Sequence, residues 1–165
     1  MIHIEYVNED NWREIVKLSV NDEQKEFIPE PIEIIAQGYI RREANAKVYA
    51  VVNESEYIGT AMTFEIDEYD GFPPRYLFAF LMIDKIYQNK GFGTKAIEAI
   101  IAELKTEKKF DYVEICVDKA NQAAFHVYTK IGFTNPKEFG YPNPWDIDES
   151  IPEPDCVNLL YRFLE

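Results

Sequence analysis

The sequence predicts a mixed α/β domain, and three features of the chain indicate it. An apolar run from Tyr76 to Ile83 has no polar alternation, which is typical of a strand in the middle of a sheet with both faces covered. A glycine turn at residues 88–94 follows the run, and an amphipathic helix pattern from Ala96 to Leu104 follows the turn. This order predicts a strand-helix-strand crossover in which 76–83 is the central strand.

The other elements follow from periodicity and turn residues along the chain. Strands are expected at 2–7, 47–52, 57–64, 76–83, 111–117 and 157–164. Helices are expected around Trp12 to Leu18 with Asn8 or Asp10 as the cap, from Pro31 to near Arg42, after the glycine turn, and at 121–130 before Gly132. The sum is a sheet of about six or seven strands with about four helices.

Length and composition favour one folded domain over residues 1–165. The chain is 47% hydrophobic and 15% aromatic, which supplies enough apolar material for a core. No apolar run approaches the roughly 18 residues of a membrane span, and no signal peptide is evident at the start, so we expect a cytoplasmic protein without a membrane partner. Cys116, Cys156 and the two histidines are scattered, so we expect free thiols and no metal site.

Acidic residues dominate the charge of the chain. Thirty acidic residues against seventeen basic ones give a formal charge of −13, which opposes binding to nucleic acid. The acids are clustered, and such clusters either form a solvated surface or attract a cationic substrate. One cluster falls in the proline-rich segment 139–155, which predicts an ordered but irregular loop.

The glycine turn predicts an anion site. A helix that starts there leaves its first backbone N–H groups without intrahelical partners, at the positive end of the helix dipole. Glycine at positions 91 and 93 permits positive φ and removes Cβ atoms that would obstruct a phosphate. The spacing does not fit a Walker loop. A dinucleotide fingerprint tolerates Ala96 as its third position, but it normally follows the first strand of its unit, whereas about half of this chain precedes Gly91.

A second pattern follows the next predicted strand. Asn121, Ala124 and Tyr128 have the spacing i, i+3, i+7, so a helix would place an amide, a small residue and a phenol on one face. Each residue alone is equally consistent with a cap or a core position. Their joint placement between Val117 and Gly132 favours a binding groove.

The two patterns together resemble the GNAT acetyltransferases. Gln88-Asn89-Lys90-Gly91-Phe92-Gly93 is similar to the acetyl-CoA pyrophosphate motif of that family, and the stretch from Val117 through Asn121, Ala124 and Tyr128 to Gly132-Phe133 resembles its following motif. Within the family, Asp22-Glu23-Gln24 followed by Phe27-Ile28 resembles bacterial spermine/spermidine acetyltransferases. The resemblance implies a GNAT fold and an N-acetyltransferase that uses acetyl-CoA as its cosubstrate.

The resemblance also assigns roles to residues. The glycine turn, the central strand and the second pattern would together hold the cofactor. On the central strand, Met82 or Ile83 would supply the N–H that polarises the thioester carbonyl. Lys90 or Lys95 would add positive charge near the pyrophosphate. The cofactor-binding residues implied are Leu81, Met82, Ile83, Gln88, Asn89, Lys90, Gly91, Phe92, Gly93, Thr94, Asn121, Ala124 and Tyr128. The substrate-binding residues implied are Gln24, Phe27 and Ile28.

Two proton transfers accompany attack of a neutral amine on a thioester. Tyr128 is the expected general acid, because a phenol with a pKa of about 10 can protonate a departing thiolate. Several family members carry an acid on the central strand, but residues 76–83 contain none, so Glu65, Glu26 or a water chain is left as the base.

The expected acceptor is a small cationic amine, such as a polyamine, because the acidic clusters would concentrate cations. The alternatives are acetylation of proteins or peptides, which would need an open peptide groove, and a CoA-binding regulatory module without turnover. Enzymes of this type are often homodimers, so self-association is a further expectation.

Overall fold

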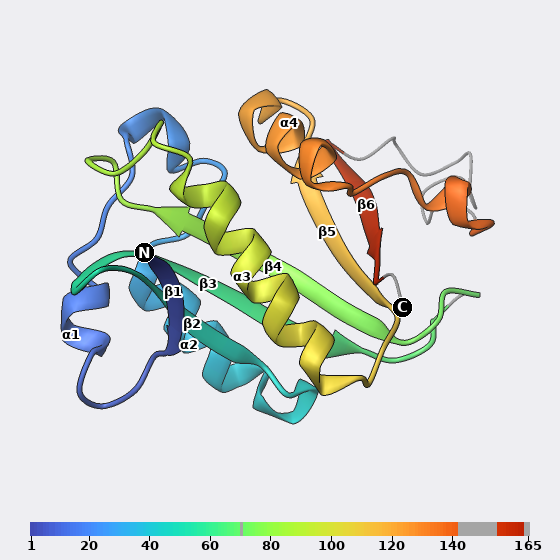
Figure 1. The fold of residues 1–165 in the computed structure, drawn as a ribbon, viewed down its shortest axis with the longest axis horizontal. Coiled ribbons are helices and arrows are strands. Elements are labelled where there is room, and N and C mark those ends of the chain that lie inside the picture. Colours follow the sequence, from blue (N-terminus) through green and yellow to red (C-terminus); the bar gives the residue numbers. More distant parts are fainter. Residues whose placement is uncertain (70, 142–154, 164–165) are drawn as a thin grey trace.

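A computed structural model describes residues 1–69, 71–141 and 155–163 of the chain. Its strands form one mixed sheet in the order β1-β2-β3-β4-β5-β6, as Figure 1 shows. The strands are β1 (Ile2–Tyr6), β2 (Lys47–Asn53), β3 (Glu56–Ile66), β4 (Arg75–Ile83), β5 (Tyr112–Asp118) and β6 (Cys156–Arg162). The α-helices are α1 (Trp12–Ile15), α2 (Pro31–Ile40), α3 (Phe92–Glu107) and α4 (Gln122–Ile131). These elements confirm the predicted mixed sheet and its helices.

All neighbouring strands are antiparallel except β4 and β5, which run parallel because α3 connects them. Helix α3 lies across one face of the sheet, and α2 packs on β2 and β3 from the opposite face (Figure 1). Helix α4 lies beside α3 and β5. The crossover predicted around the glycine turn is therefore the β4-α3-β5 unit.

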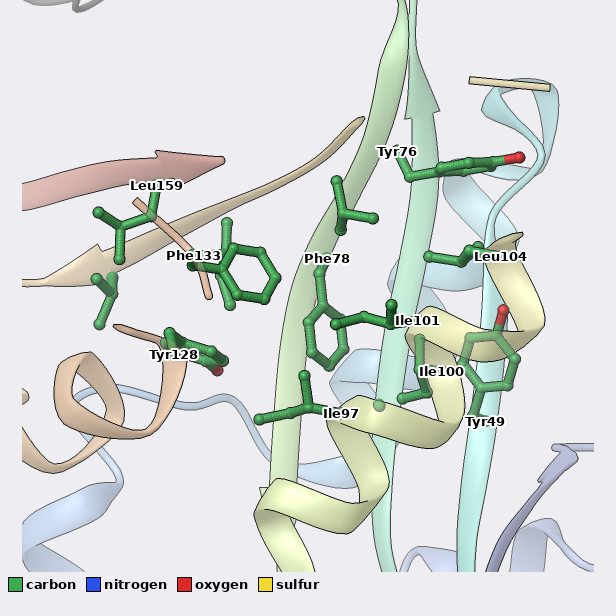
Figure 2. Packing of buried hydrophobic residues seen from close by; sticks show 14 residues of the cluster. Tyr49, Tyr76, Phe78, Ile97, Ile100, Ile101, Leu104, Tyr128, Phe133 and Leu159 are labelled. Atoms are coloured by element: carbon green, nitrogen blue, oxygen red, sulfur yellow. The ribbon is translucent and has the colours of Figure 1, made fainter. Parts of the chain in front are cut away.

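The main core lies between α3, α4 and the sheet. Figure 2 shows the apolar stripe of α3 facing Phe78 and Tyr49, with Tyr128 and Phe133 at the α4 end. Every residue of the predicted stripe is buried: Ala96, Ile97, Ile100, Ile101 and Leu104. Burial of each large aliphatic side chain contributes about 1.5–3 kcal/mol relative to exposure, so this stripe fixes α3 on the sheet.

The first helix is shorter than predicted. It spans only Trp12–Ile15, and its N-cap is Asn11. The Asn8 side chain accepts hydrogen bonds from the N–H groups of Asp10 and Asn11, while Asn11 Oδ1 accepts from the Asn8 N–H at 2.8 Å. These bonds shape the start of the helix. The helix ends after Ile15 because the N–H groups of Lys17 and Leu18 bond to the carbonyls three residues earlier instead of four.

The described residues between α1 and α2 contain a short 3₁₀ turn, η1 (Asp22–Gln24), and two similar turns follow later, η2 (Arg42–Ala44) and η3 (Pro136–Phe139). Most of the predicted irregular loop 139–155 lies outside the described residues. Among the helices in the described ranges, none is long and apolar enough to cross a membrane.

Candidate active site

The central strand β4 separates from β5 along most of its length. The two strands pair only at Tyr76 with Val113 and at Leu77 with Glu114, although β4 continues to Ile83 and β5 to Asp118. Residues 77 and 79–81 are half-buried, so the prediction that both faces of this strand are fully covered was wrong. The separation leaves the β5-facing edge of β4 without a partner strand beyond Leu77.

The hydrogen-bond pattern shows which backbone groups of β4 face that open edge. The Asp84 N–H donates to the Ile58 carbonyl at 2.8 Å, and these two residues lie opposite each other in the β3-β4 register. Opposed residues in an antiparallel pair alternate between bonded and non-bonded, so Met82 is bonded to β3, and the N–H and C=O groups of Leu81 and Ile83 point the other way. The Ile83 carbonyl already accepts from Gln88 Nε2 at 2.8 Å, so an extended ligand arm could pair with both backbone groups of Leu81 and with the N–H of Ile83.

The same alternation removes one predicted oxyanion donor. Met82 lies opposite Thr60, so its N–H belongs to the β3-β4 ladder. The bulge in β4 lies earlier, at Ala79, because Phe78 pairs with Thr63 and Phe80 pairs with Met62. Of the two residues predicted to polarise the thioester, Ile83 alone keeps an N–H on the open edge.

The glycine turn ends at the exposed N-terminus of α3. Gly91 is the N-cap with φ of 76°, no side chain caps the helix, and its first turn carries no acidic residue. The N–H groups of Phe92, Gly93 and Thr94 are therefore available to an anion. Positive φ occurs at Gly91 and at Asn89 (61°) but not at Gly93, which corrects the prediction for the second glycine.

Gly93 is not required by packing within the fold. A Cβ atom there would lie 3.8 Å from Ile83 Cγ1, an ordinary van der Waals contact. The absence of a side chain leaves space beside the free N–H groups. The Lys90 ammonium donates to the Ile86 carbonyl at 3.0 Å, whereas Lys95 is exposed on the first turns of α3.

The residues of the second predicted pattern lie at the start of α4 and along it, and α4 packs beside α3 and β5. Asn121 is the N-cap of α4, and its Oδ1 accepts from the Ala124 N–H at 3.1 Å. Tyr128 is only 8% exposed, packs edge-on against Phe133 with centroids 5.7 Å apart, and its ring lies between α4 and Ile97 in Figure 2. Its hydroxyl has no hydrogen-bond partner among the described residues. Burial raises the pKa of Tyr128 above its ordinary value, so the phenol is fully protonated at neutral pH.

The segment between α1 and α2 is tied to the cofactor side of β4. Gln88 Nε2 donates to Gln24 Oε1 at 3.0 Å and to the Ile83 carbonyl at 2.8 Å. The structure thus joins Gln24, a predicted substrate-binding residue, with two predicted cofactor-binding residues. A cavity of about 190 Å³ lies between this segment and β4, lined by Ser19, Val20, Lys25, Ile28, Pro29, Glu30, Pro31, Glu33 and Met82.

A second cavity of about 170 Å³ lies on the α2 side of the separated strands. It is lined by Gln37, Arg41, Phe64, Leu77, Phe78, Ala79, Phe80 and Cys116. The Arg41 guanidinium lies 4.6 Å from the Phe64 ring centroid, so this cavity has a cation in its wall.

A family model for the acetyltransferase (GNAT) family matches residues 11–133. The chain belongs to the GNAT family. It is therefore an acetyl-CoA-dependent N-acetyltransferase, as its two motifs predicted.

Known proteins resemble this GNAT enzyme in sequence and in fold. A probable spermine N(1)-acetyltransferase of Bacillus subtilis subsp. natto (strain BEST195) is 29% identical over 80% of this chain and 87% of its own length. The aminoglycoside acetyltransferase AAC(6')-Ib in complex with coenzyme A has a TM-score of 0.71 at 14% identity, covering 98% of this chain and 95% of that one. A Bacillus subtilis acetyltransferase in complex with CoA has a TM-score of 0.62 at 18% identity, covering 99% and 100%.

The two predicted bases of the GNAT enzyme lie in different places. Glu26 is exposed on the segment between α1 and α2, next to Lys25 of the first cavity. Glu65 lies opposite Tyr76 at the paired end of β4, and its carboxylate accepts from Lys109 at 2.5 Å and Asn45 at 2.8 Å. Lys109 follows the C-terminus of α3, so Glu65 lies at the opposite end of that helix from the glycine turn. The structure does not bring Glu65 to Tyr128, and its role as the base stays a prediction.

Sequence reasoning missed Asp84, which is 7% exposed. Its carboxylate accepts from the Ser19 N–H at 2.8 Å and the Ile86 N–H at 3.0 Å, and the Lys85 N–H donates to the Ser19 carbonyl at 2.8 Å. Asp84 thereby holds the α1-α2 segment against the end of β4. Its position as the first acid after the apolar run was the available signal.

The predicted free thiols are confirmed. Cys116 and Cys156 are both free, and Cys116 reaches the second cavity. Burial, followed by the neighbouring Cys156 thiol, raises the pKa of Cys116 well above its ordinary value. A thiol held in its protonated form is a poor nucleophile.

Proposed function

We propose that the enzyme transfers the acetyl group of acetyl-CoA to a primary amine of a small cationic molecule, a polyamine being the leading candidate. The observation that carries this proposal is the first cavity, which places Glu30 and Glu33 in its wall beside β4. Its one lysine, Lys25, is paired with Asp22 at 2.7 Å. The relative named a probable spermine N(1)-acetyltransferase supports the same acceptor class.

The contrast between the two cavities favours the first for the acceptor. Arg41 in the wall of the second cavity would repel an ammonium group, whereas carboxylates in the first would attract one. Met82 places the first cavity directly against β4, whose open edge is proposed to hold the cofactor arm. A polyamine could thus place one amine toward the thioester and a second charged group near the carboxylates.

The proposed cofactor site follows from the open backbone groups. The N–H groups of residues 92–94 would bind the CoA pyrophosphate. Both backbone groups of Leu81 and the N–H of Ile83 would pair with the pantetheine arm. The free amide nitrogen of Asn121 would contact that arm from the α4 side.

Tyr128 is the proposed proton donor to the departing thiolate. Its hydroxyl lacks a partner among the described residues and is protonated at neutral pH, so it is free to donate. Glu26 and a water chain are the remaining proposed routes for removing the amine proton.

Charge removal in the first cavity tests the acceptor class. In Glu30→Gln and Glu33→Gln, an oxygen acceptor is kept and the charge is lost, so we expect KM for spermidine to rise about two- to fivefold for each, as weak exposed ion pairs imply. KM for acetyl-CoA should stay within error. Glu23→Gln, an exposed acid of the same segment outside the cavity wall, is the matched control. An unchanged spermidine KM in both cavity variants would remove this site as the acceptor pocket.

A further inference from the structure

The second cavity, on the α2 side of the separated strands, differs from the first in the charge of its wall. Among the wall residues that the structure describes, Arg41 is the one charged side chain, and there is no carboxylate. Most of the others are apolar: Phe64, Leu77, Phe78, Ala79 and Phe80. A single cation in an apolar wall is suited to a small molecule with an anionic head and an apolar body.

The volume of the cavity limits the size of that body. It measures about 170 Å³, and an apolar cavity of about 150 Å³ is large enough to hold benzene. The apolar walls come from the sheet, where Phe64 of β3 is 9% exposed and Phe78 of β4 is 1% exposed. The cavity can therefore hold an aromatic ring or a branched aliphatic group of about that size.

The Arg41 guanidinium is positioned in this wall with its hydrogen-bond donors unused. It lies 4.6 Å from the Phe64 ring centroid, and a contact with a ring face uses no hydrogen-bond acceptor. Within the described part of the chain, Arg41 forms no ion pair and its side chain donates no hydrogen bond. The ring therefore holds the cation without neutralising it, and a planar guanidinium can bind both oxygens of a carboxylate.

Gln37 adds a second polar group from the same helix. It precedes Arg41 by four residues, so the two side chains are neighbours on the surface of α2, and both line the cavity. The Gln37 side chain makes no hydrogen bond to any other residue in the described ranges. Both polar groups of α2 are thus available to one ligand head, while the strand residues contact its apolar body.

The class of anion follows from the small number of donors. A phosphate group carries about two negative charges and three acceptor oxygens, more than one guanidinium and one amide satisfy beside apolar side chains. A carboxylate has one charge and two oxygens, which match the donors of Arg41 and Gln37. An ammonium group would be repelled by the Arg41 cation. The wall therefore favours a monocarboxylate.

We propose that the second cavity binds a small monocarboxylate with an apolar body, whose carboxylate pairs with Arg41 and Gln37. The ligand would lie on the α2 side of β4, while the cofactor arm is proposed to lie along the open edge of the same strand. The inference goes beyond the proposed function, because it holds whichever amine the enzyme acetylates.

An NMR titration of the isotope-labelled full chain with benzoate tests the proposal. Saturating CoA is present throughout, so that the probe does not bind at the N-terminus of α3. Benzoate should bind with a millimolar dissociation constant, as its few atoms imply, and should shift the backbone signals of residues 77–80 and the Arg41 Nε–H signal. Benzamide, which has the same shape without the charge, should bind at least fivefold more weakly.

Two arginine variants locate the site. Arg41→Gln should weaken benzoate binding at least fivefold, because a charged hydrogen bond is lost. Arg42→Gln is the matched control, since Arg42 lies outside the described cavity wall with its guanidinium 4.4 Å from the Tyr39 ring centroid, and it should bind benzoate like the parent chain.

Three results would overturn the proposal. The first is the absence of saturable shifts in residues 77–80 up to about 20 mM benzoate, well above a millimolar dissociation constant. The second is equal affinity for benzoate and benzamide. The third is an equal effect of the two arginine substitutions, which would show that binding follows the net charge of the protein and not the cavity.

Discussion

The side-chain amide of Gln88 donates to Gln24 Oε1 at 3.0 Å and to the Ile83 carbonyl at 2.8 Å. One residue of the glycine turn therefore links the proposed acceptor segment to the proposed cofactor strand. We therefore expect the binding of one substrate to affect the binding of the other through this side-chain amide.

Gln24→Ala and Gln88→Ala should each raise KM for the acceptor amine, because the segment between α1 and α2 loses its tie to the turn. A net hydrogen bond of about 0.5–1.5 kcal/mol corresponds to a roughly two- to tenfold change. Gln24 Oε1 also accepts from the Asn21 N–H at 3.1 Å, so Gln24→Ala removes one bond that Gln88 does not share. Because the other bond is common to both residues, the double variant should lose less than the sum of the two single variants. Steady-state kinetics of the four proteins measure this, and fully additive losses would contradict a shared contact.

Tyr128→Phe should lower kcat by roughly a hundredfold or more, because general acid catalysis typically contributes 10²–10⁴. The fold and the affinity for CoA should be preserved, since the hydroxyl has no partner among the described residues and the ring contacts remain. Titration calorimetry with CoA and rate measurements separate these effects. Tyr161→Phe, which alters another ring packed on Phe133, is the matched control. An unchanged kcat would exclude Tyr128 as the proton donor.

The pH dependence of the rate should contain no loss of activity from Tyr128 near neutrality. Burial raises the pKa of this phenol, and a raised pKa keeps the proton in place at all pH values below the ordinary value of about 10. Activity should rise with pH as the amine substrate loses its proton. A descending limb centred below about pH 9 that disappears in Tyr128→Phe would be inconsistent with this assignment.

Glu65→Gln should leave kcat within about twofold of the parent enzyme, because Glu65 lies beyond the far end of α3 from the glycine turn. Its pKa is lowered by hydrogen bonds from Lys109 and Asn45, against the opposing effect of burial. A lowered carboxyl pKa stabilises the fold above the unfolded value and loses that contribution as the pH falls. The Glu65→Gln protein should therefore be less stable than the parent at neutral pH, and the two proteins should have similar stability in acid. A large drop in kcat would restore Glu65 as a base.

Glu114→Ala should destabilise the protein by about 3–5 kcal/mol, the usual cost of leaving a buried charge unpaired. The Glu114 carboxylate pairs with Arg75 and accepts from Asn158, and both charged side chains are almost fully buried. Replacing the pair together, with Arg75→Met and Glu114→Leu, should cost much less. Denaturant unfolding provides the free energies, and an equal loss in both proteins would show that the charge is not the cause.

Local patterns predicted most of the fold. The apolar run of β4, the stripe on α3 and the cap glycines 91 and 132 report on neighbouring residues, so each could be interpreted from its own segment. The first helix was predicted too long because the N–H groups of Lys17 and Leu18 bond three residues back instead of four. Apolar periodicity does not distinguish such a tightened turn from a continuing α-helix.

The parts of the site that sequence could not predict depend on contacts between distant residues. The role of Met82 changed because the register between Ile58 and Asp84 directs its N–H to β3. Glu65 was a plausible base until the sheet placed it beside Lys109, and the contact between Gln24 and Gln88 joins segments 64 residues apart. No local periodicity encodes these distances.

The measurement that tests the central claim most directly is the initial rate of acetyl transfer at several ionic strengths. The acceptors to compare are spermidine, spermine and simple monoamines that carry no second charged group. The account predicts that the polyamines have the higher kcat/KM, and that this preference falls as salt screens the carboxylates of the first cavity. Equal turnover of polyamines and of monoamines without a second charge, insensitive to salt, would contradict the account.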